Sequence, residues 1–465
     1  MNTHNRFSVL SAVLCLAFAA AAPAARAARK AVAVPEPPPP AAVGPEEPSA
    51  WSFGGDFRLR QEAFNHIPLK TGAESRGGEN DYFRFRTRVW AAYAPCDWLT
   101  FNARLLHEFR HYLEPSHSHS WRWPDELVPD ALNVQVRTAD GTLKAVVGRQ
   151  DFLPVGEYRL FGEGTAKDGS RSSYMDAVTL VARDEADRTR LTLFGAYDNA
   201  VDPLAIGDID RDLNGYPPSD TGMDEAGAGA LLRHAFTERL RATAYYLWKH
   251  DSGSFLADGA HRPNEDIHTV GGRLETPLAG PLGAEAEVAG QWSPTSDADR
   301  RAMMAAAALY AQWQDAPGRP RAALNGLYLS ADDPDTGENE GWNPLWARYP
   351  WISELMIYAY DADGAGLWQN LAYFWAEAGL APRPGHLVRA TVGPLYAPEA
   401  DGAGGGHDRG WLGTARWDFP LWRNPGESPR LYGHLFAEAL LPGDYYADDA
   451  DDLAFFLRWE LTLGF

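Results

Sequence analysis

The last eleven residues of the chain, "FFLRWELTLGF" (Phe455–Phe465), form a β-strand pattern with two unlike faces. Aromatic and leucine side chains occupy every second position from Phe455 to Phe465, and the positions between them are mostly polar or small. In a soluble sheet, a greasy end strand would leave an exposed edge that promotes aggregation. In a closed membrane barrel it would pair with the first strand, near Trp51 to Phe64, and closure would remove both edges. The stretch therefore predicts a transmembrane β-barrel.

The composition supports an all-β protein. The 465 residues include 17 Trp, 19 Tyr and 20 Phe, and 44 Gly supply turns. No apolar run of 18 residues follows the N-terminal region, so transmembrane helices are not expected. A formal net charge of -21 argues against nucleic acid as a partner, because nucleic-acid binding needs a basic surface.

The N-terminal region predicts export. Residues 1–27 resemble a cleaved signal peptide, with Arg6 before an apolar stretch and a small-x-small site ending at Ala27. A membrane anchor is the weaker alternative, because the apolar run is short. Residues 28–50 are Pro-rich and predict a periplasmic linker, which leaves 51–465 as the outer-membrane barrel. Loss of Cys15 with the signal leaves Cys96 alone, so no intrachain disulfide is expected.

Alternating segments of about ten residues, the length of a tilted membrane strand, recur along the chain. In "DYFRFRTRVW" (81–90), for example, Phe83, Phe85 and Val89 oppose three arginines. The patterns "LTFNARLLHEFR" (99–110) and "ERLRATAYYLWKH" (238–250) alternate in the same way. Such faces suit lipid on one side and a water-filled interior on the other.

The connections provide an independent test, because an outer-membrane barrel alternates short periplasmic turns with longer outer loops. Short connections are predicted at 95–98, 139–142, 184–188, 236–238, 277–281, 315–320, 381–385 and 424–428. Long ones are predicted at 65–80, 113–128, 152–172, 199–223, 251–265, 294–300, 332–366, 398–408 and 442–451. This alternation predicts an antiparallel barrel of about 18 strands with both termini in the periplasm. The apolar piece "WISELMIYAY" (351–360) would be a nineteenth strand, and we assign it to the outer loop 332–366, where it has the option of folding into the barrel mouth. A soluble β-sandwich or β-helix is the alternative fold.

Several of these stretches resemble the alginate-export family of outer-membrane proteins. They are "FGGDFRLRQEAF" (53–64), "YFRFRTRV" (82–89), "LTFNARLLHEFR" (99–110), "LNVQVRTADGTLKAVVGRQDF" (132–152), "YMDAVTLVARD" (174–184) and "NEGWNPLWARYPWISELMIYAY" (339–360). The resemblance implies an eighteen-stranded barrel in the outer membrane of a Gram-negative-type bacterium, with arginines in the lumen that attract a polyuronate and loops that regulate access. Phe465 resembles the terminal aromatic that the outer-membrane barrel assembly machinery reads. Outer-membrane lipid and periplasmic export partners are further implied partners.

The alternation also predicts which charges face the lumen. The inward basic residues are Arg58, Arg60, Arg84, Arg86, Arg88, Arg104, Arg110, Arg137, Arg190, Arg239, Arg241, Lys249, Arg273, Arg389, Arg416 and Arg458. The inward acids are Asp56, Glu62, Glu108, Asp198, Glu275, Asp418 and Glu460. We predict that the substrate-binding, pore-lining residues are Arg58, Arg60, Arg84, Arg86, Arg88, Arg104, Arg110, Arg137, Arg149, Arg239, Arg241 and Arg458. A lumen lined by fixed guanidinium groups would concentrate carboxylates. The alternative is a structural lattice of cross-strand ion pairs.

These features predict a pore, not an enzyme, that passes anionic solutes through an arginine-lined lumen. The predicted solute is an acidic polysaccharide or oligosaccharide, exported as alginate is. Acidic loops such as "ADDPDTGENE" (331–340) would repel a polyanion from outside, which leaves one-way release or a different solute. The alternatives are a general or organic-anion porin, a soluble binding module, and a barrel enzyme that acts on lipid or surface glycan, for which His107 is the one histidine to consider.

No cofactor or metal is predicted. The pair His117 and His119 lacks a third ligand. In "DIDRDLNG" (208–215) the aspartates follow calcium-loop spacing, but Ser219 stands where a glutamate is needed.

Overall fold

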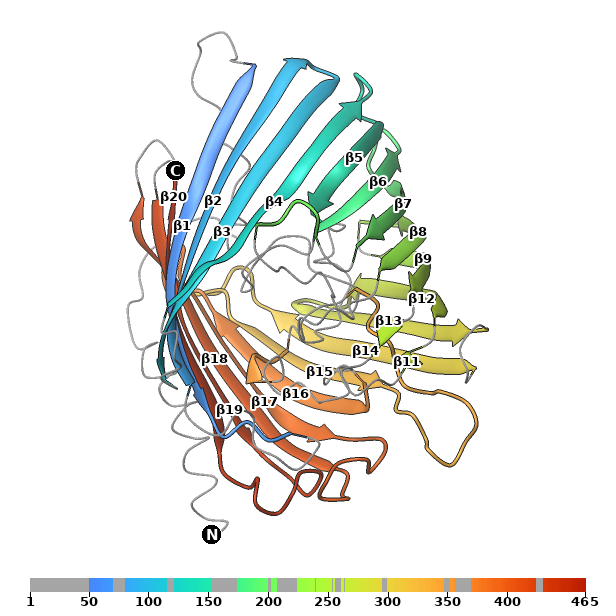
Figure 1. Cartoon of the computed structure of the whole chain (residues 1–465), viewed down its shortest axis with the longest axis vertical. Helices are drawn as coiled ribbons and strands as arrows, with labels where there is room; N and C mark the ends of the chain where they lie inside the picture. The colour runs from blue at the N-terminus through green and yellow to red at the C-terminus, as the bar shows by residue number, and fades with distance from the viewer. Residues whose placement is uncertain are drawn as a thin grey trace.

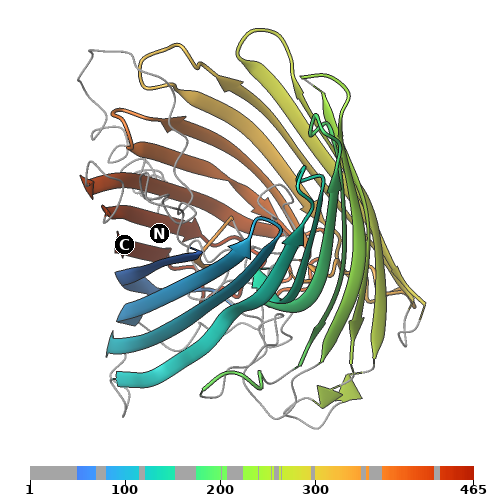
Figure 2. The ribbon, with the colours of Figure 1, turned by 90° about the horizontal axis from the view of Figure 1, so that it is seen from above.

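The computed structural model confirms the predicted all-β fold: a closed antiparallel barrel of eighteen strands (Figures 1 and 2). It describes residues 50–69, 80–114, 121–151, 174–199, 202–206, 224–238, 240–252, 254–255, 261–262, 264–294, 299–346, 352–355, 369–423 and 430–465. Over these residues, no helix has both the length and the apolar character needed to cross a bilayer.

Each barrel strand pairs with its neighbours in chain order. The strands are β1 (Trp51–Asn65), β2 (Asn80–Cys96), β3 (Leu99–Glu114), β4 (Trp121–Arg137), β5 (Leu143–Asp151), β6 (Tyr174–Arg183), β7 (Thr189–Asp198), β8 (Glu225–Ala235), β9 (Arg241–Asp251), β12 (Glu265–Pro277), β13 (Leu282–Ser293), β14 (Arg300–Gln312), β15 (Arg321–Leu329), β16 (Leu371–Leu380), β17 (Leu387–Tyr396), β18 (Asp408–Arg423), β19 (Arg430–Leu441) and β20 (Ala454–Gly464). A separate pair, β10 (Ser254–Phe255) and β11 (His261–Arg262), lies within the β9–β12 connection.

The seam closes where the sequence pattern predicted. β20 runs antiparallel to β1, with Leu461 opposite Leu59 and Phe456 opposite Phe64. Beyond the strand, Gly55 and Phe465 exchange two backbone hydrogen bonds of 2.9 and 3.0 Å. The last segment of the chain therefore has no free edge on this side.

The two faces of each strand differ in burial as the alternation requires. In β20, Leu457 is 50% exposed on the outer face, whereas its neighbour Arg458 is 3% exposed on the inner face. The inner face also carries a hydrophobic cluster that runs between strands and includes Phe64, Leu247 and Tyr373. The lumen is thus partly filled by side chains.

Short connections join the strands at one rim, and the longer ones lie at the other. The β4–β5 turn shows why a short connection suffices: Asp140 accepts hydrogen bonds from the Thr138 hydroxyl (2.5 Å) and from the backbone N–H of Thr142 (3.0 Å). These bonds, first the one from Thr138, lower the pKa of the Asp140 carboxyl to about 2. Gly141, at φ +69°, supplies the left-handed residue that the turn needs.

One predicted connection differs clearly from the structure. The connection predicted at 113–128 is shorter, because β3 extends to Glu114 and β4 already begins at Trp121. A bulge in β4 opposite Arg104 and Leu105 allows this long strand to keep its pairing with β3. The segment 351–360 contributes no barrel strand over its described part, residues 352–355, as the assignment to a loop requires.

Candidate functional site

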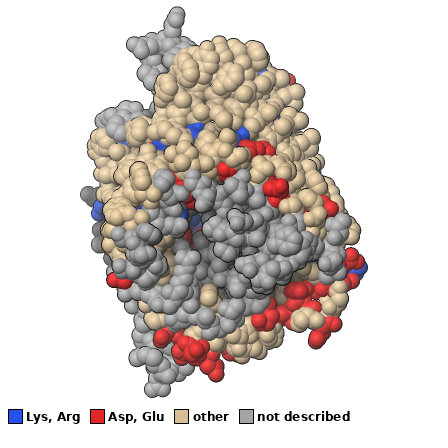
Figure 3. All heavy atoms as spheres, viewed as in Figure 1, with Lys and Arg blue, Asp and Glu red and all other residues tan. Residues whose placement is uncertain are grey.

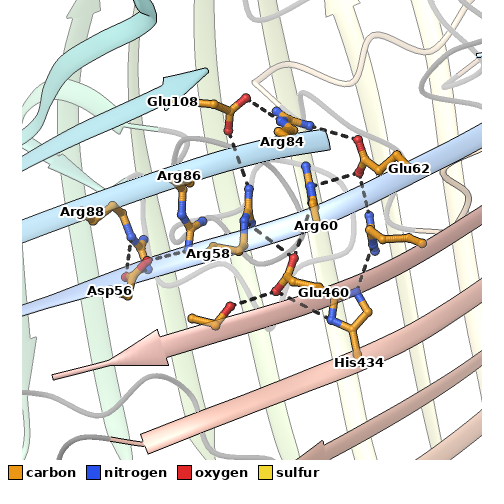
Figure 4. Close-up of polar contacts among 12 residues, drawn as sticks. Asp56, Arg58, Arg60, Glu62, Arg84, Arg86, Arg88, Glu108, His434 and Glu460 are labelled. Atoms are coloured by element: carbon orange, nitrogen blue, oxygen red, sulfur yellow. Dashed lines mark hydrogen bonds and ion pairs between the residues drawn. The ribbon is translucent and has the colours of Figure 1, made fainter. Parts of the chain in front are cut away.

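One side of the lumen carries a dense network of arginines and carboxylates, which we call the arginine wall (Figure 4). It is formed by the inner faces of β20, β1, β2 and β3, which are neighbours in the barrel. Its members are Arg58, Arg60, Arg84, Arg86, Arg88, Arg110 and Arg458, with Asp56, Glu62, Glu108 and Glu460. All seven arginines were predicted from alternation to face the lumen.

The strand register brings like charges directly opposite each other. Arg58 pairs across the strands with Arg86, and Arg60 pairs with Arg84. Arg84 in turn lies opposite Arg110 on β3. Directly opposed like charges destabilise a sheet. The same register places each acid directly opposite another arginine, which offsets this repulsion: Asp56 opposite Arg88, Glu62 opposite Arg458, Glu108 opposite Arg86 and Glu460 opposite Arg60.

Each acid of the wall is shared by several guanidinium groups. Asp56 accepts from Arg86 at 3.0 Å and from Arg88 at 2.8 Å. Glu62 lies 3.1 Å from Arg60, 3.6 Å from Arg84 and 3.5 Å from Arg458. A fixed guanidinium fork suits such sharing, because it presents several donors in one plane.

The other two acids link the centre of the wall to its edges. Glu108 accepts from Arg84 and lies 3.3 Å from Arg110, with Arg58 at 3.7 Å. Glu460 lies 3.7 Å from both Arg58 and Arg60. Eight of the eleven side chains are thus connected through Glu62, Glu108 and Glu460, and Asp56 holds Arg86 and Arg88 beside them.

His434 on β19 also contacts residues of the arginine wall. Arg458 donates to His434 Nε2 at 3.0 Å, and His434 Nδ1 lies 3.7 Å from Glu460. Alternation had not identified His434 as part of the site.

The arginine wall has more positive than negative groups. Its seven arginines face four wall carboxylates, and all eleven side chains are mostly buried. Charges held in a low-dielectric surface attract counter-ions more strongly than the same charges in bulk water. An excess of guanidinium groups at this place favours anions in the lumen.

The remaining predicted pore-lining residues lie apart from this wall. Arg104 binds Asp130 at 2.7 Å and Asp151 at 2.6 Å. Arg137 is exposed near the short-turn rim, where it donates to the Asp97 carbonyl at 2.7 Å. Arg241 is exposed at the start of β9, and Arg239 lies outside the described residues.

Arg149 is enclosed by protein groups. It makes bidentate pairs with Asp176 (2.9 and 3.0 Å) and Asp202 (both 2.9 Å), and its guanidinium lies over the ring of Tyr174. The preceding Gly148 has φ +112°, a conformation that favours glycine. A solute-binding role for Arg149 remains a prediction.

Other inward cations carry their own acids. Lys249 lies 2.6 Å from Glu225, and Arg273 lies 2.7 Å from Glu285. Arg190 lies 3.3 Å from Asp187 and Arg416 donates to Asp418 at 2.9 Å, whereas Arg389 is exposed opposite Arg416. The cation excess predicted for the whole lumen is therefore concentrated at the arginine wall.

Several acids that contact lumen cations were not predicted from the sequence. Those with a basic partner are Asp130, Asp151, Asp176, Asp202, Glu225, Asp251, Glu265, Glu285, Glu354 and Glu377. Alternation in "LGAEAEVAGQWS" (282–293) was sufficient to place Glu285 and Glu287 inward. No periodic pattern marks Glu354, because it lies in a loop.

The inner faces of β13, β14 and β15 contrast with the arginine wall, and we call them the alanine wall. Their buried apolar residues are Ala289, Ala302, Met304, Ala306, Ala308, Ala323, Leu327 and Leu329. Ala306 illustrates the register, since it lies opposite Glu287 on one side and Leu327 on the other. Small side chains here leave space for another segment of the chain.

That segment comes from the β15–β16 connection, and we call its described residues 341–346 and 352–355 the inner loop. Gln291 donates to the Asn343 carbonyl at 2.7 Å and accepts from its N–H at 2.9 Å. Lys249 donates to the Leu345 carbonyl at 3.1 Å. Trp346 is fully buried against Gly227, where a Cβ would have no room. The loop is thus anchored to β8, β9 and β13.

The other described end of the inner loop reaches the arginine wall. Ser353 donates to Glu438 on β19, whose second oxygen accepts from the Glu354 N–H at 2.8 Å. The Glu354 carboxylate lies 2.9 Å from Arg458 Nη1. Because seven strands separate β9 from β19 in the barrel order, the inner loop crosses the lumen. Residues 352–355, the described part of the segment 351–360, therefore lie inside the barrel, as the sequence analysis allowed.

The weaker motifs do not form a second site among the described residues. His107 lies on the outer face, with its ring 4.5 Å from that of Trp123. Within the described ranges, no cluster of three potential metal ligands occurs. His117, His119 and the stretch 208–215 with Ser219 lie outside those ranges.

The acidic loops lie away from the lumen arginines. Asp335, Asp448, Asp449 and Asp451 are exposed in long connections. Figure 3 shows acidic side chains gathered along the lower part of the viewed face. The protein therefore has a local cationic surface inside and an acidic rim outside.

Comparison with known proteins shows a likeness in structure only. No model of a protein family matches the chain, and no curated protein matches it. Among solved structures, the outer membrane protein OpdK of Pseudomonas aeruginosa is 13% identical, with a TM-score of 0.54 over 89% of this chain and 99% of that one. OccK2 (OpdF) of the same organism, solved in complex with glucuronate, is 12% identical, with a TM-score of 0.50 over 89% and 97%. OccAB1 of Acinetobacter baumannii is 11% identical, with a TM-score of 0.52 over 89% and 96%. The chain thus has the eighteen-stranded fold of these outer-membrane barrels.

Proposed function

We propose that the protein is an outer-membrane pore for small organic anions, above all carboxylates. The observation that carries the proposal is the arginine wall, where seven guanidinium groups face four wall carboxylates inside a barrel. Arg84, Arg86 and Arg88 are mostly buried and paired with Glu62, Glu108 and Asp56, so they act on an anion in the lumen through the net positive field of the wall. The barrier to permeation is thereby lowered for anions and raised for cations.

The interior of the barrel is also apolar in part, because the alanine wall and the inner loop supply buried small and aromatic side chains, among them Ala306 and Trp342. Apolar surroundings of this kind suit organic solutes better than bare ions. Two of the structural neighbours support this solute class, since OccK2 was solved with glucuronate and OpdK with vanillate. Export of an acidic polysaccharide is the second candidate, favoured by the family resemblance of the sequence. We rank it lower because the inner loop occupies part of the path that a polymer would need.

The proposal is tested with purified protein in planar bilayers. We expect a reversal potential that indicates anion preference in a KCl gradient, and concentration-dependent block by glucuronate and vanillate. Cation preference, or an open channel that these carboxylates do not affect, would contradict it. Preferential block by long uronate oligomers would favour the polysaccharide candidate, and phospholipid hydrolysis by the purified protein would favour the enzyme alternative.

The location is tested separately. A closed barrel should migrate faster on a denaturing gel before boiling than after it, and should fractionate with the outer membrane. If salt alone released the protein from the membrane fraction, and boiled and unboiled samples migrated identically, a soluble binding module would be favoured.

A further inference from the structure

The inner loop places a carboxylate of its own on the arginine wall. Glu354 lies 2.9 Å from Arg458 Nη1, and Arg458 is 3% exposed. The backbone of Glu354 is fixed independently, because its N–H donates to Glu438 at 2.8 Å. Its side chain therefore reaches Arg458 from a loop, whereas the four wall acids belong to strands.

The surroundings of Arg458 resemble a binding site for a carboxylate with an apolar body. Its guanidinium carbon lies 5.2 Å from the ring centre of Phe436 and 5.6 Å from that of Phe456. The two rings meet edge to face at 5.9 Å. Phe456 is fully buried and Phe436 is half-buried, so a ligand whose charge meets the guanidinium would pack its apolar part on Phe436.

We infer that Glu354 is an internal competitor: it occupies, at Arg458, the position of the carboxylate of an aromatic solute. The inference rests on the proposed function and names one binding position within it. A solute carboxylate binds there by replacing one charge-assisted contact with an equivalent one, so Arg458 keeps a carboxylate partner, and the displaced Glu354 carboxylate stays in the lumen on a backbone held at Glu438. The competitor lowers the affinity of the site, which suits a pore, because tight binding would slow release.

The chain offers a closely matched control for a test. Glu338 belongs to the same β15–β16 connection and also lies 2.9 Å from an arginine, Arg301. Arg301 is on the outer face of β14 and is 64% exposed on its side chain. E338Q therefore removes the same charge from the same connection without altering the lumen contact.

The experiment measures block of single-channel current by benzoate in wild type, E354Q, E338Q and S353A. With the competitor neutralised, E354Q should be blocked at a concentration about tenfold lower than wild type, the scale of one charge-assisted hydrogen bond. The E338Q channel should be blocked at the same benzoate concentration as wild type. S353A loses a hydrogen bond to Glu438 but keeps the Glu354 carboxylate, so it should also remain close to wild type.

The outcomes separate this inference from the proposed function. If wild type is anion-selective and blocked by benzoate but E354Q matches E338Q, the competitor is wrong and the pore stands. If S353A shifts as far as E354Q, loosening of the loop and not charge competition causes the effect, which also overturns the inference. If wild type shows neither anion preference nor block, the proposed function fails and the inference fails with it.

Discussion

The arginine wall and the alanine wall are built on the same antiparallel strand geometry, but one is charged and the other is apolar. In the arginine wall, register places Arg58 opposite Arg86 and Arg60 opposite Arg84, so the β1–β2 pair needs acids to offset repulsion. In the alanine wall, Ala306 lies opposite Leu327, a pair that needs no such support. One wall thus concentrates charge at a cost in stability, and the other provides a surface on which the inner loop can lie.

Under the proposed function, this contrast assigns the action on the solute to one side of the lumen. Buried ion pairs are weak evidence for stability, because desolvation offsets much of the attraction between the charges. A barrel that needed only a stiff interior could repeat the alanine wall all round. The excess of arginine over wall carboxylate is the feature that stiffness alone does not explain.

The largest effect should come from removing the charge of one arginine ladder. R84Q/R86Q/R88Q leaves four wall arginines against four wall carboxylates and Glu354, so the preference should turn from anions towards cations. We expect the anion-to-cation permeability ratio to fall by about tenfold or more, with open-channel current retained. Reversal potentials in a KCl gradient measure it.

A triple variant at the short-turn rim, R137Q/R183Q/R188Q, is the charge-matched control for this prediction. It removes three positive charges away from the wall, so its permeability ratio should change much less. Equal changes in both triple variants would show that overall charge, and not the arginine wall, sets selectivity.

The second prediction compares one buried acid from each wall. E108Q leaves Arg58, Arg84 and Arg110 without their shared carboxylate, and breaking a buried pair costs about 3–5 kcal/mol. E287Q, beside the alanine wall, weakens a hydrogen bond from the Tyr245 hydroxyl, at a cost of about 1–2 kcal/mol. Urea unfolding in detergent, followed by heat-modifiable migration, measures both. A larger cost for E287Q would contradict the view that the arginine wall is the strained one.

Most of the barrel could be predicted from the sequence because its signals are local. Period-two alternation in β2 and β20, and turns such as 139–142, depend only on neighbouring residues. The boundary at 113–128 was wrong because the β4 bulge interrupts alternation just where the strand continues. Both termini in the periplasm, the signal peptide and the domain limits stay predictions.

The third prediction alters the alanine wall alone. A306F places a large side chain where Ala306 is 5% exposed, and overpacking of this kind costs about 1–3 kcal/mol. The single-channel current should fall because the inner loop must shift, but the permeability ratio should stay near that of wild type. A308G, a reduction in volume two residues away, is the control for backbone effects. A selectivity change as large as that of the arginine triple would show that the two walls are not separable.

The site itself was only half predictable. Alternation identified the arginines, since it assigns a face to each residue of a strand. It could not pair Arg84 with Glu62 and Glu108, because partners are set by register between strands that are distant in sequence. Glu354 was beyond its reach altogether, since the position of a loop residue inside the lumen depends on contacts such as those of Asn343 and Leu345 with the far wall.

The smallest change in the free energy of unfolding is expected for R60Q. This variant also distinguishes best between a scaffold role and a surplus-cation role for the arginine wall. Arg60 is 1% exposed, lies opposite Arg84 and contacts Glu62 at 3.1 Å, so a scaffold role predicts a loss comparable to that of E108Q. If the wall instead carries surplus cations, removing Arg60 relieves its repulsion with Arg84, while Glu62 keeps Arg84 and Arg458. We therefore expect a stability change within about 1 kcal/mol, because lost attraction and relieved repulsion oppose each other. The anion-to-cation ratio should fall, but less than in the triple variant. Unfolding and reversal potential measured on the same preparation decide between the two roles: a loss of several kcal/mol with unchanged selectivity would make the arginine wall a structural lattice.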